Sequence, residues 1–264
     1  MHIVVLVKPV PDPASGGERL GSDGRLDRAS TPAVVNGNDE YALEAALKLT
    51  AAAGEGSEVT LLSMAPASAP DTLRKALAMG ANRGIHVTDP ALAGSCAVST
   101  ATVLAAALRT IECDLILAGV DTSDGLGGSV PSAVAAHLGL PFLSFAALIE
   151  PDEAGRTVRV RRISPTGYDL LEASMPALIS CTQALGEPRY PSLKGIMAAR
   201  SKEITTRSLG DLGIDPGAVG GAVATTKVLD TRVPPARGAT EVVRGSATDG
   251  ATRILGFLGE RRLI

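Results

Sequence analysis

The alternation of short apolar runs with alanine- and leucine-rich helical stretches constrains the fold of this chain more than any other feature. Five runs in the first 150 residues have the length and the β-branched content of strands, at residues 3–7, 59–64, 84–87, 115–118 and 142–148. Continuous apolar runs of this kind are typical of parallel strands that are covered on both faces. Their alternation with helical stretches predicts a doubly wound α/β fold with a mainly parallel sheet.

Capping residues mark where the helices between these strands begin and end. Asn38 is expected to cap the first helix, whose first turn carries Asp39 and Glu40. Three further helices are expected at about residues 71–80, 97–108 and 129–139. The first and the last of these three end at glycines, which are favoured just beyond a helix C-terminus.

The pattern changes after about residue 149. Residues 157–163 and 168–173 flank a Ser-Pro-Thr-Gly turn sequence and predict an antiparallel pair of strands. Residues 175–181 predict one more buried strand. The second part of the domain is therefore expected to add antiparallel strands to the parallel sheet.

The C-terminal quarter has a different composition. Residues 210–250 are rich in Gly, Ala, Thr and Pro and contain few large apolar groups, so they cannot pack a core of their own and predict an extended arm that lies on a partner. An apolar helical stripe returns at 254–258. The predicted organisation is an α/β domain at 1–185 with an antiparallel addition at 150–181, a loop at 186–202, and an arm with a short helix at 203–264.

Composition argues against several classes of function. The net charge of −3 and the 2% aromatic content, with no Trp, leave neither a basic patch nor stacking platforms for nucleic acid. The three cysteines and three histidines are scattered, which predicts free thiols, no metal site and a reducing compartment. The apolar N-terminal run is too short to span a membrane and lacks the features of a secretory signal, so we expect a cytoplasmic protein.

The strongest local signal for ligand binding is the glycine-rich loop at 119–129, which follows a predicted strand and precedes a helix. Open α/β sheets bind ligands at the carboxyl ends of their strands, and free N–H groups at a helix N-terminus favour an anion such as phosphate. The loop has neither the Gly-Lys-Ser/Thr of a Walker motif nor the position of a Rossmann fingerprint. Its spacing leaves phosphate binding and a simple flexible turn both open.

Catalytic patterns are weak. Asp121 and Asp124 are three residues apart in this loop, but nothing in the sequence indicates the burial that would raise their pKa values for acid–base catalysis. A hydrolytic triad is disfavoured because the chain has no nucleophile elbow. The chain is therefore expected not to be an enzyme.

A second unusual segment lies at 186–202, where three apolar residues, Leu193, Ile196 and Met197, stand among arginines and lysines. An apolar anchor inside a polar rim is how a transient protein interface is built. Because Pro191 precedes Leu193 and Lys194-Gly195 follow it, we expect the leucine to be exposed outside any helix or strand that would bury it.

The run Glu-Pro-Arg-Tyr-Pro-Ser-Leu-Lys-Gly-Ile-Met-Ala-Ala-Arg-Ser-Lys at 187–202 closely resembles the signature of electron-transfer flavoprotein β subunits. Four further blocks support the resemblance, at 5–12, 36–42, 74–81 and 114–119, so that it covers almost the whole chain. The resemblance implies an adenine-nucleotide α-hydrolase-like fold. It also implies an α subunit that holds a redox-active FAD, acyl-CoA-type dehydrogenases as electron donors, and AMP or a second FAD bound to this chain.

The resemblance also assigns residues. The positions that match the family's nucleotide site are Leu6, Asn36, Gly37, Asn38, Asp39, Met64, Gly119, Val120, Asp121, Thr122, Ser123, Asp124, Gly125, Leu126, Gly127, Gly128, Ser129 and Val130. The positions assigned to partner binding are Glu187, Pro188, Arg189, Tyr190, Leu193, Ile196 and Met197. No catalytic and no metal-binding residue is assigned.

Two alternatives remain beside an electron carrier that passes electrons toward the respiratory chain. In the first, the chain is a subunit of a flavin-based electron-bifurcating complex and holds a second FAD. In the second, suggested by the fold alone, it is a stand-alone adenine-nucleotide hydrolase-like or sensor domain.

Overall fold

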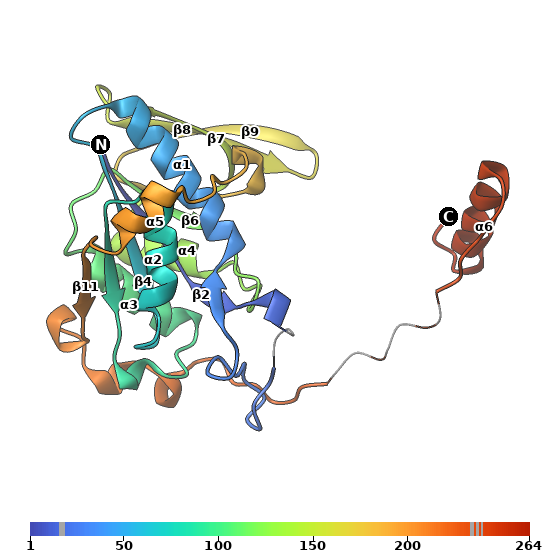
Figure 1. Cartoon of the computed structure of the whole chain (residues 1–264), viewed down its shortest axis with the longest axis horizontal. Coiled ribbons are helices and arrows are strands. Elements are labelled where there is room, and N and C mark those ends of the chain that lie inside the picture. Colours follow the sequence, from blue (N-terminus) through green and yellow to red (C-terminus); the bar gives the residue numbers. More distant parts are fainter. Residues whose placement is uncertain (16–18, 233–234, 236–237, 239) are drawn as a thin grey trace. The chain divides into compact units, whose positions relative to one another are not determined.

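The computed structural model describes residues 1–264 except 16–18, 233–234, 236–237 and 239. It divides into two units, Met1–Val228 and Leu229–Ile264. The first unit is built on a nine-stranded sheet with the strand order β11-β5-β4-β1-β6-β10-β7-β8-β9 (Figure 1). The strands are β1 (His2–Leu6), β4 (Glu58–Met64), β5 (Arg83–Val87), β6 (Leu115–Gly119), β7 (Phe142–Asp152), β8 (Thr157–Ser164), β9 (Gly167–Ser174), β10 (Ala177–Cys181) and β11 (Ile204–Arg207).

The sheet is parallel from β11 to β7 and antiparallel from β7 to β9. The chain leaves β1 toward β4 on one side and returns to β6 on the other, so the direction of winding switches between β1 and β6. A small second sheet pairs β2 (Pro9–Pro11) with β3 (Ala33–Val35) just after β1. The predicted doubly wound α/β class is confirmed, and ligands of such sheets bind at this kind of switch point.

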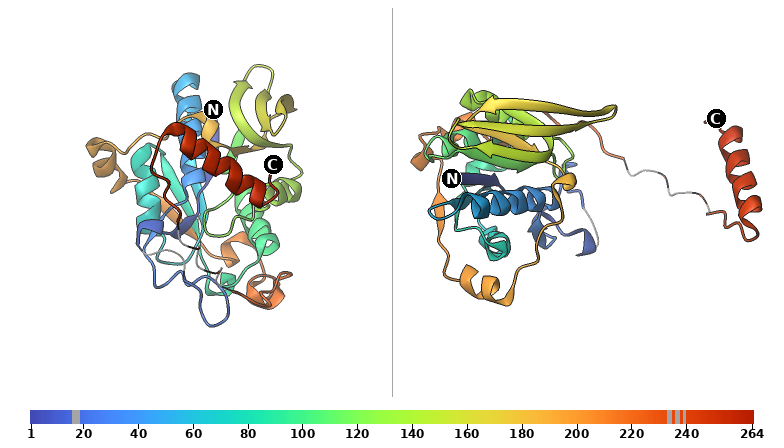
Figure 2. Two further views of the ribbon diagram at one scale, coloured as in Figure 1. Left: turned by 90° about the vertical axis from the view of Figure 1, so that its right-hand side faces the viewer. Right: turned by 90° about the horizontal axis from the view of Figure 1, so that it is seen from above.

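Helices cover both faces of the sheet (Figure 2). They are α1 (Gly37–Ala53), α2 (Pro70–Met79), α3 (Ala97–Leu108), α4 (Val130–Leu138) and α5 (Leu193–Ala199). One buried apolar cluster joins α1 and α2 to the sheet, and another joins α3 and α4 to its opposite face. Proline begins α2, and left-handed or otherwise positive φ values at Gly80 and Gly139 end α2 and α4, as expected.

Residues 177–181 differ from the predicted antiparallel addition. They form β10, which lies between β6 and β7 and runs parallel to both. All five residues are buried, because both faces of this central strand are covered. The antiparallel part of the sheet is therefore limited to the strands from β7 to β9, while the chain returns to the parallel part through β10.

Residues 204–223 differ from the predicted arm, because they pack on the first unit. β11 adds a parallel edge strand to β5, and Leu209 and Val219 are buried in the α3 and α4 cluster. Gly220 has φ +81°, and a Cβ there would lie 2.1 Å from the carbonyl oxygen of Ala91. Glycine is therefore used here for a close backbone approach rather than for an extended chain.

The second unit contains α6 (Ala247–Glu260), which is longer than the predicted stripe at 254–258. Ser246 and Asp249 form a reciprocal capping box at its start, and none of its residues is buried. Part of the predicted arm falls on positions 233–234, 236–237 and 239, which lie outside the described residues. Within the described residues, no helix has the length and apolar character needed to cross a membrane.

Candidate functional site

Asn36 links two segments that are far apart in the sequence, the turn at 36–39 and the loop at 119–130. Its Nδ2 donates to the carbonyl oxygen of Asp121 (2.9 Å), and its Oδ1 accepts from the N–H of Ser123 (3.1 Å). The Asn36 side chain is 1% exposed and, although it stands at the N-cap of α1, makes no capping bond. The predicted cap at Asn38 is wrong, because Asn38 lies in the first turn of α1 and donates to Asp121 Oδ1 (2.6 Å).

Asp39 ties the ends of β1 and β6 to the start of α1. Its carboxylate accepts the N–H of Lys8 (2.8 Å) and the N–H of Gly119 (3.2 Å). Burial raises the pKa of Asp39 to about 7, against the effect of these donors, which favour the ionised form. A Cβ on Gly119 would lie 2.6 Å from Asp39 Oδ1 and 2.7 Å from the backbone of Asn38, so only glycine fits at the end of β6.

A cluster of charges lies beside this link. Asp124 accepts from Lys8 Nζ (2.8 Å), which also donates to Thr122 Oγ1 (3.2 Å). Arg28 forms an ion pair with the other carboxylate oxygen of Asp124, at 2.5 Å. Burial acts to raise the pKa of Asp124, but Lys8, Thr122 and Arg28 outweigh it and hold that pKa below its usual value. The carboxylate is therefore ionised and held between two cations.

The loop after β6 presents backbone donors. The N–H groups of Gly127, Gly128 and Ser129 have no acceptor among the described residues. Gly128 has φ +58°, a left-handed conformation that suits glycine. Ser129 stands at the N-cap of α4 without a side-chain bond to it. Unpaired N–H groups at a helix N-terminus attract an anion, so the loop can receive a phosphate group.

The structure brings the sequence-predicted nucleotide residues to one edge of the sheet. The turn at 36–39 and the loop at 119–130 are directly bonded to each other. Leu6 and Met64 stand at the ends of the neighbouring strands β1 and β4 and pack on the α3 side of the sheet. Contact of all these residues with a nucleotide remains a prediction.

Two residues of this edge were not predicted as site residues, Lys8 and Arg28. Lys8 lies two residues beyond the last residue of β1, Leu6, and its place near a strand end is the sequence signal that could have identified it. Arg28 lies in the connection between β2 and β3, far from any motif, and only the folded chain brings it to Asp124.

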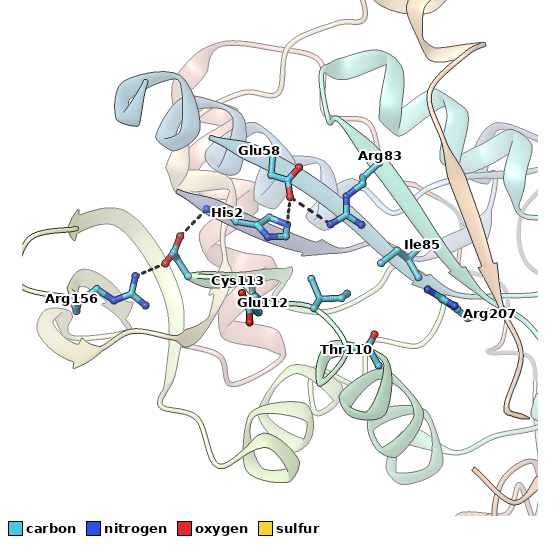
Figure 3. Close-up of a pocket in the computed structure, with 11 residues that line it drawn as sticks. His2, Glu58, Arg83, Ile85, Thr110, Glu112, Cys113, Arg156 and Arg207 are labelled. Atoms are coloured by element: carbon cyan, nitrogen blue, oxygen red, sulfur yellow. Dashed lines mark hydrogen bonds and ion pairs between the residues drawn. The ribbon is translucent and has the colours of Figure 1, made fainter. Parts of the chain in front are cut away.

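A pocket of about 650 Å³ lies at the opposite, amino-terminal edge of the sheet (Figure 3). His2 Nε2 and Arg83 both contact Glu58 Oε1, at 3.2 Å and 3.5 Å, and Arg156 pairs with Asp114. The carboxylates of Glu58 and Asp114 thus pair with arginines at the pocket wall. The pocket was not predicted, because its residues come from separate segments and carry no common motif. It holds none of the predicted nucleotide residues.

The segment at 187–202 forms a second candidate site. Tyr190 is 95% exposed and Leu193 77% exposed, and Ile196 and Met197 are exposed beside them. The predicted exposure of Leu193 is confirmed, but the expectation that it lies outside a helix is wrong. Leu193 begins α5, where Ser192 Oγ accepts the N–H of Gly195 (3.0 Å).

Polar residues tie this segment to the body of the protein. Arg189 donates to the buried carboxylate of Glu44 on α1 through Nε (2.7 Å), NH2 (3.1 Å) and its backbone N–H (3.1 Å). Arg74 on α2 donates to the carbonyl oxygen of Ala199 (2.8 Å), at the end of α5. Lys202 donates in return to the carbonyl of Ala81 (2.6 Å), just after α2. The two helices therefore satisfy each other's C-terminal carbonyls.

The approach of α5 to α2 is close. A Cβ on Gly195 would lie 2.4 Å from the carbonyl oxygen of Ala78. Figure 2 shows α5 outside α2, on the side away from the sheet. A groove of about 320 Å³ remains between the two helices, with Ile196 and Pro191 on one side and Arg74 and Lys75 on the other. The segment thus presents apolar side chains outward, together with the exposed cations Lys194 and Arg200, while Arg189 and Lys202 bond to the body of the protein.

Comparison with known proteins identifies a family that covers most of the chain. A family model described as the electron transfer flavoprotein domain matches residues 23–212. The chain is 39% identical to the electron transfer flavoprotein subunit beta of Mycobacterium tuberculosis, over 100% of this chain and 99% of that protein. It is 32% identical to the subunit of the same name from Clostridium acetobutylicum and 33% identical to the caffeyl-CoA reductase-Etf complex subunit CarD of Acetobacterium woodii, each over the full length of both chains.

Proposed function

The chain belongs to the electron transfer flavoprotein family as a β subunit, and from this membership we propose that it carries electrons from dehydrogenases such as acyl-CoA dehydrogenases toward the respiratory chain. It is an electron-carrier subunit rather than an enzyme. Its partner is the α subunit that the family name implies. A FAD held mainly by that α subunit would supply the reversible uptake of electrons, while this chain supplies binding surfaces and orientation.

We propose further that this chain binds an adenine nucleotide, AMP, at the carboxyl edge of β1 and β6. The observation that carries this proposal is the bonding of the 36–39 turn to the glycine loop, whose N–H groups at 127–129 have no acceptor among the described residues. The residues fit such a group, because the glycines leave room for phosphate oxygens: a Cβ on Gly127 would meet only the carbonyl oxygen of Gly125, at 4.0 Å, and one on Gly128 only Val120 and Asp121.

Chemical analysis of the purified heterodimer tests this proposal. We expect one FAD and one AMP per heterodimer after denaturation and chromatographic separation of the released nucleotides. In Gly128→Val, a β-branched side chain at φ +58° obstructs the loop, so AMP should be lost while FAD and assembly remain. Full AMP occupancy in that variant would place the nucleotide elsewhere, and a heterodimer with no second nucleotide would contradict the proposal.

A second candidate function is electron bifurcation, in which this chain holds a second FAD instead of AMP. The relative from the caffeyl-CoA reductase-Etf complex favours this alternative. The same chemical analysis separates the two, because a bifurcating complex would release two FAD and no AMP. A stand-alone adenine-nucleotide hydrolase-like or sensor domain has only the fold in its support.

We propose that the exposed residues of the 187–202 segment bind the dehydrogenase. Leu193 has the largest exposed fraction among its apolar helix residues and stands in a frame of cations, which suits an acidic-rimmed pocket on the partner. Glu187 and Pro188 precede the tied Arg189 and would flank this contact. The three free cysteines, far apart in the sequence, support a cytoplasmic setting for this exchange.

The C-terminal unit would embrace the α subunit. Within α6 the apolar side chains of Ile254, Leu255 and Phe257 are exposed, and no residue of the helix is buried. An apolar stripe of this kind is stabilised when another protein covers it. We expect removal of residues 229–264 to weaken assembly with the α subunit, measured by size-exclusion chromatography, while the first unit still folds.

A further inference from the structure

Three charged side chains from separate segments meet at the glycine loop: Lys8 after β1, Arg28 from the connection between β2 and β3, and Asp124 from the loop itself. The side chain of Asp124 is fully buried, whereas those of Lys8 and Arg28 remain 38% and 39% exposed. The ammonium of Lys8 lies against the loop backbone, 4.0 Å from the position of a Cβ on Gly125. The two cations therefore contact the loop through Asp124 and Thr122, within its first half.

The cluster keeps unused hydrogen-bonding capacity. A guanidinium has five N–H donors and an ammonium has three. Arg28 contacts only Asp124 Oδ2 among the described side chains, through an ion pair whose geometry is not that of a hydrogen bond. Lys8 Nζ donates to Asp124 and Thr122 and has one donor left. If the cluster served only to hold the loop, we would expect fewer N–H donors of Arg28 and Lys8 to be left unpaired.

An anion can bind at the loop only if Lys8 and Arg28 offset the negative charges of Asp121 and Asp124. Asp121 and Asp124 would repel a phosphate, because like charges in a partly buried site raise each other's energy. Asp121 is held by Asn38, and Asp124 by Lys8 and Arg28. Two positive and two negative side chains cancel, so the loop N–H groups and the N-terminus of α4 can then attract the anion.

We propose that Lys8 and Arg28 are nucleotide-binding residues that pair with the phosphate of the bound adenine nucleotide, and that Asp124 is the positioning residue that holds them at the loop. This inference rests on the proposed nucleotide site and deepens it. The base and ribose would be held by other parts of the edge, so the two cations distinguish a phosphorylated nucleotide from its nucleoside.

Calorimetric titration of the heterodimer, freed of its copurified nucleotide, with AMP and with adenosine tests the assignment. Arg28→Met and Lys8→Met should each weaken AMP binding roughly tenfold or more, the cost of one charge-assisted pair. Adenosine binding should change less than twofold. Arg28→Lys should restore most of the AMP affinity. Arg19→Met, which removes an exposed charge from the same connection, is the matched control and should leave both affinities unchanged.

The outcomes separate this inference from the proposed function. If the unchanged protein binds neither AMP nor adenosine, the nucleotide site itself is refuted and the inference falls with it. If the unchanged protein binds AMP and the Met variants bind it equally well, the inference alone is refuted. Equal weakening of AMP and adenosine would also refute it, because that pattern belongs to an ion-pair cluster that only stabilises the loop. Thermal melting of each variant confirms that the protein tested is folded.

Discussion

The nucleotide edge and the 187–202 segment use polar groups in opposite ways. At the edge, Asn36 and Asp39 are buried and bond backbone groups of remote segments, while the loop leaves its own N–H groups unpaired. In the 187–202 segment, Arg189 and Lys202 bond inward and the apolar Leu193 faces outward. The proposed site for a small anion thus relies on spare polar groups, and the proposed site for a protein on spare apolar groups.

This comparison predicts that changes at the edge alter stability and nucleotide content, whereas changes at the segment alter exchange with other proteins. The largest expected effect is the pH dependence of stability caused by Asp39. Its pKa is about 7 in the folded chain and 3.8 as the ordinary value. Protonated Asp39 therefore contributes fully to the free energy of unfolding below about pH 4, and this contribution is lost as the pH rises through 7. The total loss is at most about 4 kcal/mol.

Asp39→Asn isolates this contribution. Between pH 4 and pH 8 the free energy of unfolding of the unchanged protein should decline relative to that of the variant, measured by urea denaturation at each pH. Parallel curves would show that Asp39 titrates normally in the fold. The variant also loses one acceptor for the N–H groups of Lys8 and Gly119, which lowers its stability by a similar amount at every pH.

The next largest effect is expected from Gly119→Ala. Its Cβ would overlap Asp39 and the backbone of Asn38, so the start of α1 must move away from β6 at a cost of about 3 kcal/mol. Gly250→Ala in α6 is the matched control, because a Cβ there meets nothing within 4 Å and the residue is not among the predicted nucleotide positions. The melting temperature and the nucleotide content should both fall in Gly119→Ala. Neither should fall in the control variant. An unchanged melting temperature for Gly119→Ala would contradict the expectation that changes at this edge of the sheet alter stability.

Leu193→Ala tests the 187–202 segment. Loss of an interface anchor should slow electron transfer from a cognate dehydrogenase about ten- to a hundredfold, at 1.4 kcal/mol per factor of ten. Flavin content, assembly and melting temperature should stay within error, because the side chain contributes to no core of this chain. A destabilised variant with undiminished turnover would assign Leu193 to packing instead.

The smallest effect is expected from Arg74→Met, which removes the donor to the end of α5. The loss is about 1 kcal/mol, confined to the segment. Cleavage by trypsin at Lys194 and Arg200 should become faster while global melting changes little. Lys75→Met, an exposed neighbour without this bond, should leave the cleavage rate unchanged. Equal rates in both variants would mean that the segment is held by other contacts.

The sequence predicted the parts of this fold that depend on local pattern. Apolar runs gave the strands around β1 and β6, and helix-ending glycines gave the limits of α2 and α4. The predicted cap at Asn38 is wrong because the side chains of Asn36 and Asn38 bond to Asp121, which is 85 and 83 residues away in the sequence. The capping preference of a residue depends on its neighbours in the sequence, so it does not reflect a partner that is so far away.

The same limit explains the other differences. The glycine-rich composition predicts an extended arm that includes residues 204–223, although Gly220 and Gly221 use their small size to approach the backbone at 91–93. Arg28 carries no local signal, since its partner Asp124 lies on another segment. The glycine loop itself could be predicted from the sequence, because its residues are consecutive.

The mutual ties between α2 and α5 have a consequence for the speed of partner exchange. Because Arg74, Lys202 and Glu44 already hold the segment in shape, the ordering entropy of its backbone is spent during folding and not at each encounter. A surface of this kind needs no slow rearrangement before it docks, and a contact centred on a few exposed side chains separates quickly. If the proposed dehydrogenases dock here, their complexes with this chain should form fast and be short-lived.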